Sequence, residues 1–145
     1  MRYLADINVV FSLLVAGHAH NPVAWEWWDQ REPESVGWVL PVKLGVLRLL
    51  TNNVAMVGNP LAPVEALGAW DAFNRDPRTS ELEFPSTAQE QKLRQFVEGR
   101  KPSPNLWTDA WLAAVAESLE CTLTSFDSGF QAFGLCSFEL LKDGG

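Results

Sequence analysis

The sequence predicts an α/β domain with a mostly parallel sheet, and two observations lead to that prediction. Short apolar segments typical of strands alternate with longer amphipathic segments typical of helices along the whole chain. The composition, with 47% hydrophobic and 20% charged residues, is that of a folded globular protein rather than a disordered chain. The 145 residues are enough to bury one sizeable core, so we expect a single domain over 1–145.

The predicted elements follow one another with clear local signals. In the first half we expect a strand at 2–6, helices at 8–15 and 21–32, a strand at 35–40 and a helix at 41–52. In the second half we expect helices at 62–76, 86–99 and 106–120, strands at 81–85, 121–126 and 137–141, and a short helix within 127–134. Asn21 with Pro22 and, further on, Pro41 are favourable helix starts, and Gly99 is a natural helix end.

Asp109 is predicted to lie on the buried face of its helix. At about 100° per residue it shares that face with four apolar residues, Leu112, Ala113, Ala116 and Leu119. Glu117 and Ser118 are expected on the solvent side instead. A buried acid is costly unless something pairs with it, which favours a functional role. The alternative is that the helix N-terminus alone stabilises this first-turn aspartate.

Asp6 and Asp127 each come directly after a predicted strand. Taken alone, either is explained as a residue that starts a turn. Carboxyl ends of parallel strands meet at one edge of the sheet, so with Asp109 they would form an acidic cluster there. Two carboxylates about 4 Å apart repel by about 4 kcal/mol at an effective dielectric constant of about 20. Such a cluster persists around a cation or with raised pKa values, and its oxygens suit Mg²⁺ or Mn²⁺, ions that serve phosphodiester hydrolysis.

Four segments in order resemble the motifs of PIN-domain ribonucleases, specifically the VapC-type toxins of bacterial toxin–antitoxin pairs. They are LADINVVFSLL at 4–14, LPVKLGVLRLLTN at 40–52, WTDAWLAAVAE at 107–117 and TLTSFDSGF at 122–130. The resemblance covers nearly the whole chain and implies a single PIN domain with a three-layer α/β/α sandwich. It also implies an Mg²⁺- or Mn²⁺-dependent endoribonuclease, with an RNA substrate, a homodimer and inhibition by a cognate antitoxin.

The resemblance assigns roles to particular residues. Asp6, Asp109 and Asp127 would be the catalytic acids that bind the metal. Asn8 and Ser125 would be supporting polar groups that orient the acids or waters.

Lys43 departs from the family pattern, which has an acid at this position. It lies on the apolar face of its helix, so its charge points inward or its long side chain reaches out to water. We expect its ammonium to enter the acidic site and pair with Asp6, Asp109 or Asp127. The predicted consequence is weak metal binding and low or absent RNA cleavage.

Bulk properties restrict the remaining possibilities. The net charge of −7 argues against nucleic-acid binding driven by overall charge, although a bound cation reverses the local sign. Cys121 and Cys136 are expected to be reduced thiols in the core of a cytoplasmic protein. No apolar run approaches the roughly 18 residues of a membrane span, so no membrane association is expected. The sequence has one local basic cluster, made of Arg94, Arg100 and Lys101. We expect it to be either a solvated helix end or a surface that contacts RNA phosphates or an acidic segment of the antitoxin.

Two residue groups lie outside the predicted acidic site. His18 and His20 are expected in a solvated loop, with a metal-binding pair as the less favoured alternative. Trp25 and Trp28 are expected to be exposed anchors of an interface, because tryptophan favours interfaces.

Two alternatives to an active ribonuclease remain open. A degenerate PIN module that binds RNA or protein without cleavage is supported by Lys43. An aspartyl-phosphate enzyme or phosphoacceptor domain also uses acids and a lysine at strand ends. It is disfavoured because the first motif is Asp-x-Asn and because Lys43 is predicted on a helix.

Overall fold

The computed structural model describes residues 2–83 and 86–143. Within these residues, five strands form one sheet in the order β3-β2-β1-β4-β5, and all neighbours are parallel. The strands are β1 (Tyr3–Ala5), β2 (Val36–Trp38), β3 (Thr79–Glu81), β4 (Thr122–Ser125) and β5 (Phe138–Leu140). The helices are α1 (Ile7–Leu14), α2 (Asn21–Asp29), α3 (Leu40–Leu50), α4 (Pro63–Arg75), α5 (Ser86–Val97), α6 (Leu106–Ser118) and the 3₁₀ helix η1 (Ser128–Phe133).

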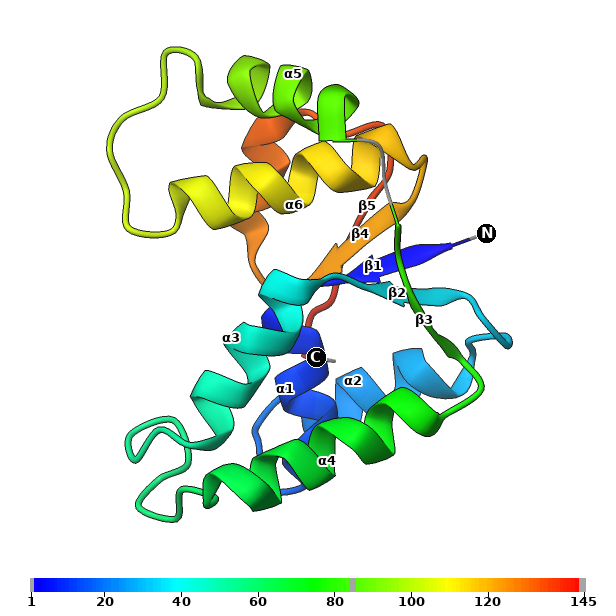
Figure 1. Ribbon diagram of the computed structural model, residues 1–145, viewed down its shortest axis with the longest axis vertical. Helices are drawn as coiled ribbons and strands as arrows, with labels where there is room; N and C mark the ends of the chain where they lie inside the picture. Colours follow the sequence, from blue (N-terminus) through cyan, green and yellow to red (C-terminus); the bar gives the residue numbers. More distant parts are fainter. Residues whose placement is uncertain (1, 84–85, 144–145) are drawn as a thin grey trace.

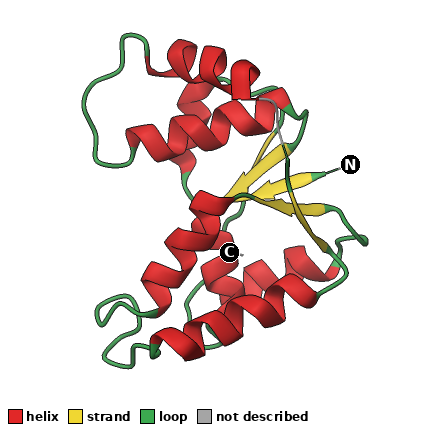
Figure 2. Ribbon diagram, viewed as in Figure 1, coloured by secondary structure: helices red, strands yellow, loops and turns green. Residues whose placement is uncertain are grey.

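The helices cover both faces of the sheet, which confirms the predicted α/β class and three-layer arrangement. Helices α1 to α4 lie on one side of the sheet, and α5 and α6 lie on the other (Figures 1 and 2). Strand β1 sits in the middle of the sheet, between β2 and β4. The carboxyl ends of β1 and β4 are therefore neighbours, although these strands come from opposite ends of the sequence.

One predicted strand is displaced. The sequence pointed to 81–85, whereas β3 is Thr79–Glu81 and pairs with Val36–Trp38 of β2. Thr79–Glu81 is the segment that pairs with β2, although the residues that follow it in the sequence are more apolar. Leu82, just after β3, packs its side chain over Gly37, where a Cβ atom would lie 2.5 Å from it. Residues 84 and 85 of the predicted strand lie outside the described residues.

Close packing between α1 and α3 fixes the start of α1. Gly45 of α3 faces the side chain of Ile7, and a Cβ atom added at Gly45 would overlap Ile7. The glycine thus lets the two helices approach, which is a common reason for glycine inside a helix. Because Ile7 directly follows Asp6, this contact also holds one of the predicted site residues in place.

Three predictions about exposure are wrong. Cys136, predicted to be a core thiol, is exposed, whereas Cys121 is buried as predicted. Trp28 is 3% exposed and its ring stacks on Phe73, so it is a core residue and no interface anchor. Glu117 and Ser118 are half-buried rather than solvent-facing, because the chain before β5 covers that side of α6. Glu117 accepts a hydrogen bond there from the Cys136 backbone N–H at 2.6 Å. Trp25, by contrast, is 43% exposed as expected.

Within residues 2–83 and 86–143, no helix has both the length and the apolar character needed to cross a membrane.

Candidate functional site at the carboxyl edge of the sheet

Asp6 is the residue between β1 and α1, and both of its carboxylate oxygens accept hydrogen bonds. Its Oδ1 accepts a hydrogen bond from the Ile7 backbone N–H at 2.8 Å, and its Oδ2 accepts one from Ser125 Oγ at 2.7 Å. The side chain thus caps α1 and links β1 to the end of β4. Asp6 is only 7% exposed, so its position is determined by the fold rather than by solvent.

The side chains of Ser125 and Asn8 link the start of α1, next to Asp6, to the segment after β4 that carries Asp127. Besides donating to Asp6, Ser125 Oγ accepts hydrogen bonds from the Asp127 backbone N–H at 2.9 Å and from Asn8 Nδ2 at 3.1 Å. Asn8 Oδ1 in turn accepts a hydrogen bond from the Phe126 backbone N–H at 3.2 Å. The buried hydroxyl uses its donor and both acceptor positions, and the network fixes the segment that carries Asp127.

Asp109, in the first turn of α6, has an unpaired carboxylate. No described residue donates a hydrogen bond to its side chain or forms an ion pair with it, and the side chain is half-buried. Burial, together with the charges of Asp6 and Asp127, raises the pKa of Asp109 from 3.8 to about 7. Stabilisation by the helix N-terminus would act in the opposite direction and lower this pKa.

Asp127 completes the acidic group at the start of η1. It does start a turn, because its Oδ1 accepts a hydrogen bond from the Gly129 backbone N–H at 2.8 Å. It is also close enough to Asp6 and Asp109 that its charge raises the pKa of both. For Asp6 the largest cause of the raised pKa is burial, which the hydrogen bonds from Ser125 and Ile7 partly offset. The structure therefore brings the three predicted acids together.

Lys43 does not form the predicted ion pair. Among the described residues, none of the aspartates lies within ion-pairing distance of its ammonium. The Nζ atom lies instead 6.0 Å from the centre of the Trp38 ring. The helix face was predicted correctly, but the long side chain runs along an aromatic surface rather than into the acidic group. In the described part of the chain, none of the three acids is in an ion pair with a basic side chain.

The acids are suited to a divalent cation in chemistry. Carboxylate oxygens are the ligands that Mg²⁺ and Mn²⁺ prefer, and the unpaired Asp109 beside Asp6 and Asp127 is a site of uncompensated negative charge. Within the described part of the chain, no group of three His, Cys, Asp or Glu side chains is gathered tightly enough to hold a metal ion. The metal therefore stays a prediction based on the donor atoms.

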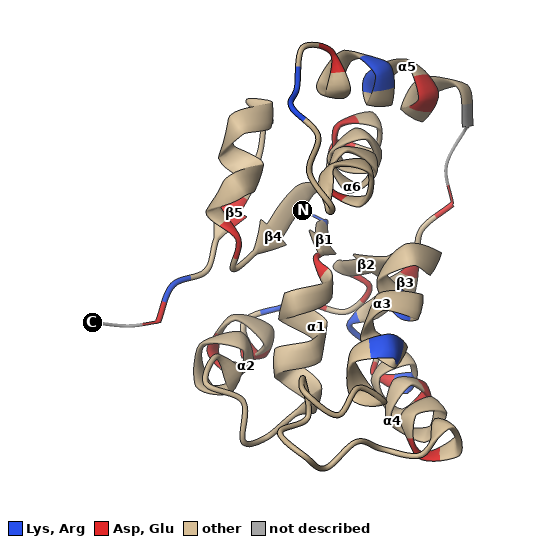
Figure 3. Cartoon of the chain, turned by 90° about the vertical axis from the view of Figure 1, so that its left-hand side faces the viewer, with Lys and Arg blue, Asp and Glu red and all other residues tan. Residues whose placement is uncertain are grey.

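A hollow of about 320 Å³ opens beside Asp109 and Asp127. It lies between η1 and the segment that joins α5 to α6, and Figure 3 looks onto this side of the molecule. Arg100 and Lys101, part of the predicted basic cluster, line it. Ser103, Asn105 and Phe133 line it too, and sequence reasoning missed them. The signal was weak, because polar residues next to prolines, as at Ser103 and Asn105, are typical of any loop.

The two histidines take part in packing and hydrogen bonds near the site. His20 stacks on Phe126 with ring centres 4.3 Å apart, and its Nδ1 lies 2.8 Å from Asp143 Oδ1. His18 Nδ1 accepts a hydrogen bond from the His20 backbone N–H at 3.0 Å. Burial, followed by the nearby His20, lowers the pKa of His18. The stack supports Phe126, which stands between Ser125 and Asp127.

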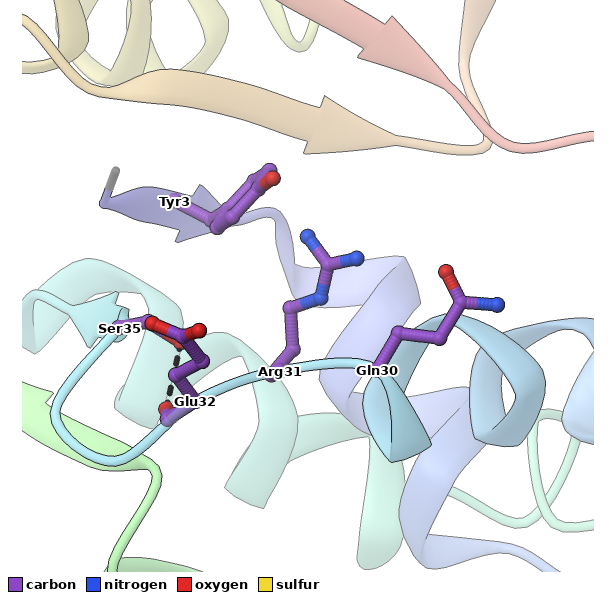
Figure 4. A pocket seen from close by; sticks show the side chains of 5 residues that line it. All are labelled: Tyr3, Gln30, Arg31, Glu32 and Ser35. Carbon is purple, nitrogen blue, oxygen red and sulfur yellow. Dashed lines mark hydrogen bonds between the residues drawn. The ribbon is translucent and has the colours of Figure 1, made fainter.

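A second hollow, of about 250 Å³, lies near the start of β1 and contains none of the predicted site residues (Figure 4). Arg31 packs its guanidinium group over the Tyr3 ring at 4.2 Å and donates from Nε to the Trp27 carbonyl. Ser35 Oγ donates to the Glu32 carbonyl at 2.7 Å. These contacts hold the loop between α2 and β2 in place.

The parallel three-layer fold with acids at its carboxyl edge is that of a PIN-type protein. No protein-family model matches the chain. It is 31% identical over 142 residues to Ribonuclease VapC41 of Mycobacterium tuberculosis, found in two strains, and the match covers 95% of this chain and 97% of that protein. The chain therefore belongs to the VapC ribonuclease family.

Solved structures agree with this fold. VapC20 of Mycobacterium tuberculosis, a sarcin–ricin loop cleaving toxin, superposes with a TM-score of 0.67 at 19% identity, covering 97% of this chain and 99% of that one. VapBC2 from Rickettsia felis, bound to a DNA fragment from its promoter, gives a TM-score of 0.65 at 17% identity, covering 98% and 100%.

Proposed function

We propose that this protein is the endoribonuclease toxin of a type II toxin–antitoxin pair and that it depends on Mg²⁺ or Mn²⁺. Membership of the VapC ribonuclease family supports the ribonuclease activity. The observation that carries the proposal is the half-buried Asp109 carboxylate, which has no hydrogen-bond donor among the described residues and lies within electrostatic reach of Asp6 and Asp127. A bound cation would stabilise the charged form of an acid so placed.

Asp6, Asp109 and Asp127 would hold the cation, which lowers the pKa of a water molecule and neutralises charge on the leaving oxygen. The chain itself keeps the acids in position. The Ile7 N–H and the Ser125 hydroxyl hold the two oxygens of Asp6. The Gly129 N–H holds Asp127. These restraints mean that two of the three acids are oriented before any ligand binds.

The test is cleavage of a mixture of structured and single-stranded RNAs by the purified protein with Mn²⁺. We expect cleavage that EDTA abolishes and that Asp109→Asn reduces by about a hundredfold or more. Asp71→Asn, at an exposed acid on α4, is the matched control and should cleave like the native chain. Native protein that leaves every RNA intact, or cleavage that survives Asp109→Asn, would contradict the proposal.

We also propose a cognate antitoxin and a homodimer as partners in the cytoplasm. The solved VapBC2 structure from Rickettsia felis supports a protein partner for this fold. An apolar groove of about 300 Å³, lined in part by Pro41, Leu93 and the 62% exposed Trp107, is a surface that such a partner would cover. Light scattering of the purified chain, alone and after co-expression with a neighbouring small open reading frame, tests both partners.

A second candidate function is a module that binds RNA or protein without cleavage. Lys43, which brings a positive charge and no ligand oxygen to a position where the family resemblance implies an acid, favours it. If the native chain binds RNA but does not cleave it and Lys43→Glu gains Mn²⁺-dependent cleavage, this second function replaces the first.

A further inference from the structure

The hollow beside the acids is lined by basic, acidic and uncharged residues. We call it the rim pocket and define it by Arg100, Lys101, Ser103, Asn105, Leu106, Asp109, Asp127, Gly129 and Phe133. Its volume of about 320 Å³ is at the small end of the roughly 300–1,000 Å³ that ligand pockets span. Asp109 and Asp127 line the rim pocket, so whatever fills it lies next to the proposed cleavage site.

Arg100 forms a flat and rigid part of the wall. Its Nε donates to the Phe96 carbonyl at 3.1 Å, and its Nη2 donates to the Ala132 carbonyl at 2.6 Å. Its guanidinium carbon lies 4.5 Å from the centre of the Phe133 ring. Phe96 packs behind Phe133 with ring centres 5.4 Å apart. A guanidinium plane held in this way is a surface on which a nucleic-acid base stacks.

Ser103 and Asn105 provide hydrogen-bonding groups that the protein does not use. Asn105 precedes α6, but its side chain does not cap the helix. Neither side chain has a hydrogen-bond partner among the described residues. The prolines at 102 and 104 fix two backbone angles of this segment, which lowers the entropy lost when it binds a ligand. An amide that both donates and accepts suits the edge of a base.

Lys101 adds an exposed positive charge at the same rim, for which no ion pair exists among the described residues. Asp109 and Asp127 line the same pocket, so an unshielded phosphate is repelled by these acids and attracted to Lys101. This polarity fits a nucleotide whose base lies against Arg100 and whose phosphate faces Lys101.

We propose that the rim pocket binds one unpaired nucleotide of the RNA, next to the phosphodiester at the acidic site. Its base stacks on Arg100 and hydrogen-bonds to Asn105 and Ser103. This inference rests on the proposed ribonuclease function and extends it, because it predicts a base preference at one position beside the cleavage site.

The experiment measures RNA binding without cleavage, in EDTA at low ionic strength, by fluorescence anisotropy. The probes are hexauridine, hexauridine with a central A, C or G, and a hexamer of abasic ribose phosphate. We expect the best base-bearing hexamer to bind about tenfold more tightly than the abasic hexamer. Arg100→Lys, which keeps the charge but loses the plane, should remove most of this advantage. Asn105→Ala should reduce the differences among the bases.

The matched control is Asn59→Ala, at an exposed asparagine in the connection between α3 and α4, which should bind like the native chain. Thermal melting of each variant separates loss of binding from loss of folding. No binding of any hexamer, equal binding of abasic and base-bearing hexamers, or an unchanged base advantage in both folded variants would overturn the inference. RNA cleavage is scored separately. A chain that binds with base preference but cleaves nothing refutes the proposed function alone, and one that cleaves without base preference refutes the rim pocket alone.

Discussion

Removing the charge of Asp109 is expected to stabilise the metal-free protein near pH 8. The unfolded chain has the ordinary Asp pKa of 3.8, whereas the folded chain has a pKa of about 7 at Asp109. Between these values the folded state binds more protons than the unfolded state, so this group makes stability fall as pH rises from about 4 to about 7. Above that range the whole penalty is present, and below pH 4 it is absent.

The size of the penalty follows from the shift. At about 1.4 kcal/mol per pKa unit, the upper limit is on the order of 4 kcal/mol. Asp109 is only half-buried, so solvent screening reduces this figure, and we expect about 2 kcal/mol. Asp109→Asn should therefore raise the free energy of unfolding by about that amount at pH 8 and by almost nothing at pH 4.

The assay is urea unfolding in EDTA at pH 4.5, 6 and 8, followed by tryptophan fluorescence. Asp71→Asn is the control, because Asp71 is exposed and distant in sequence from the acids. A variant that is less stable than the native chain at pH 8, or a gain that does not depend on pH, would refute the reasoning about the three acids.

The remaining predictions address the framework of the site. Ser125→Ala leaves the buried Asp6 carboxylate without its hydroxyl donor, so urea unfolding at pH 7 should show a loss of about 1–3 kcal/mol, and no loss would show that this hydrogen bond is dispensable. Gly45→Ala places a methyl group on the Ile7 side chain, so calorimetry should show a lower melting temperature and a loss of about 1–3 kcal/mol, and a melting temperature equal to or above that of the native chain would contradict it. Lys43→Glu should tighten Mn²⁺ binding about tenfold in titration calorimetry, equivalent to about 1.4 kcal/mol, and equal affinities would remove Lys43 from the explanation of metal binding.

The fold could be predicted because its signals are local. Apolar strands alternate with amphipathic helices, and this pattern predicted an α/β domain with a mostly parallel sheet, whereas the three-layer arrangement was implied by the family resemblance. The displacement of β3 to Thr79–Glu81 could not be predicted, because pairing with β2 decided it and the segment itself is not strongly apolar. Trp28 shows the same limit, since a tryptophan suits a core and an interface equally well until its neighbours are known.

The meeting of Asp6, Asp109 and Asp127 could be expected because parallel strands end at the same edge and because Asp109 lies on the inner face of its helix. Two details depended on tertiary contacts. The position of the Lys43 ammonium near Trp38 could not be predicted, because a helix pattern gives the face of a residue but not the course of a long side chain. The bridging position of the Ser125 hydroxyl depends on the exact spacing of β1 and β4.

The hydrogen bond between Ser125 and Asp6 also has a consequence for protein synthesis. Strand β1 needs β4 as its neighbour in the sheet, and Asp6 needs a hydroxyl that is translated long after it. A nascent or prematurely terminated chain that ends before β4 contains Asp6 and Asp109 but no assembled site. The acidic centre would therefore form only after β4 and Asp127 have left the exit tunnel of the ribosome.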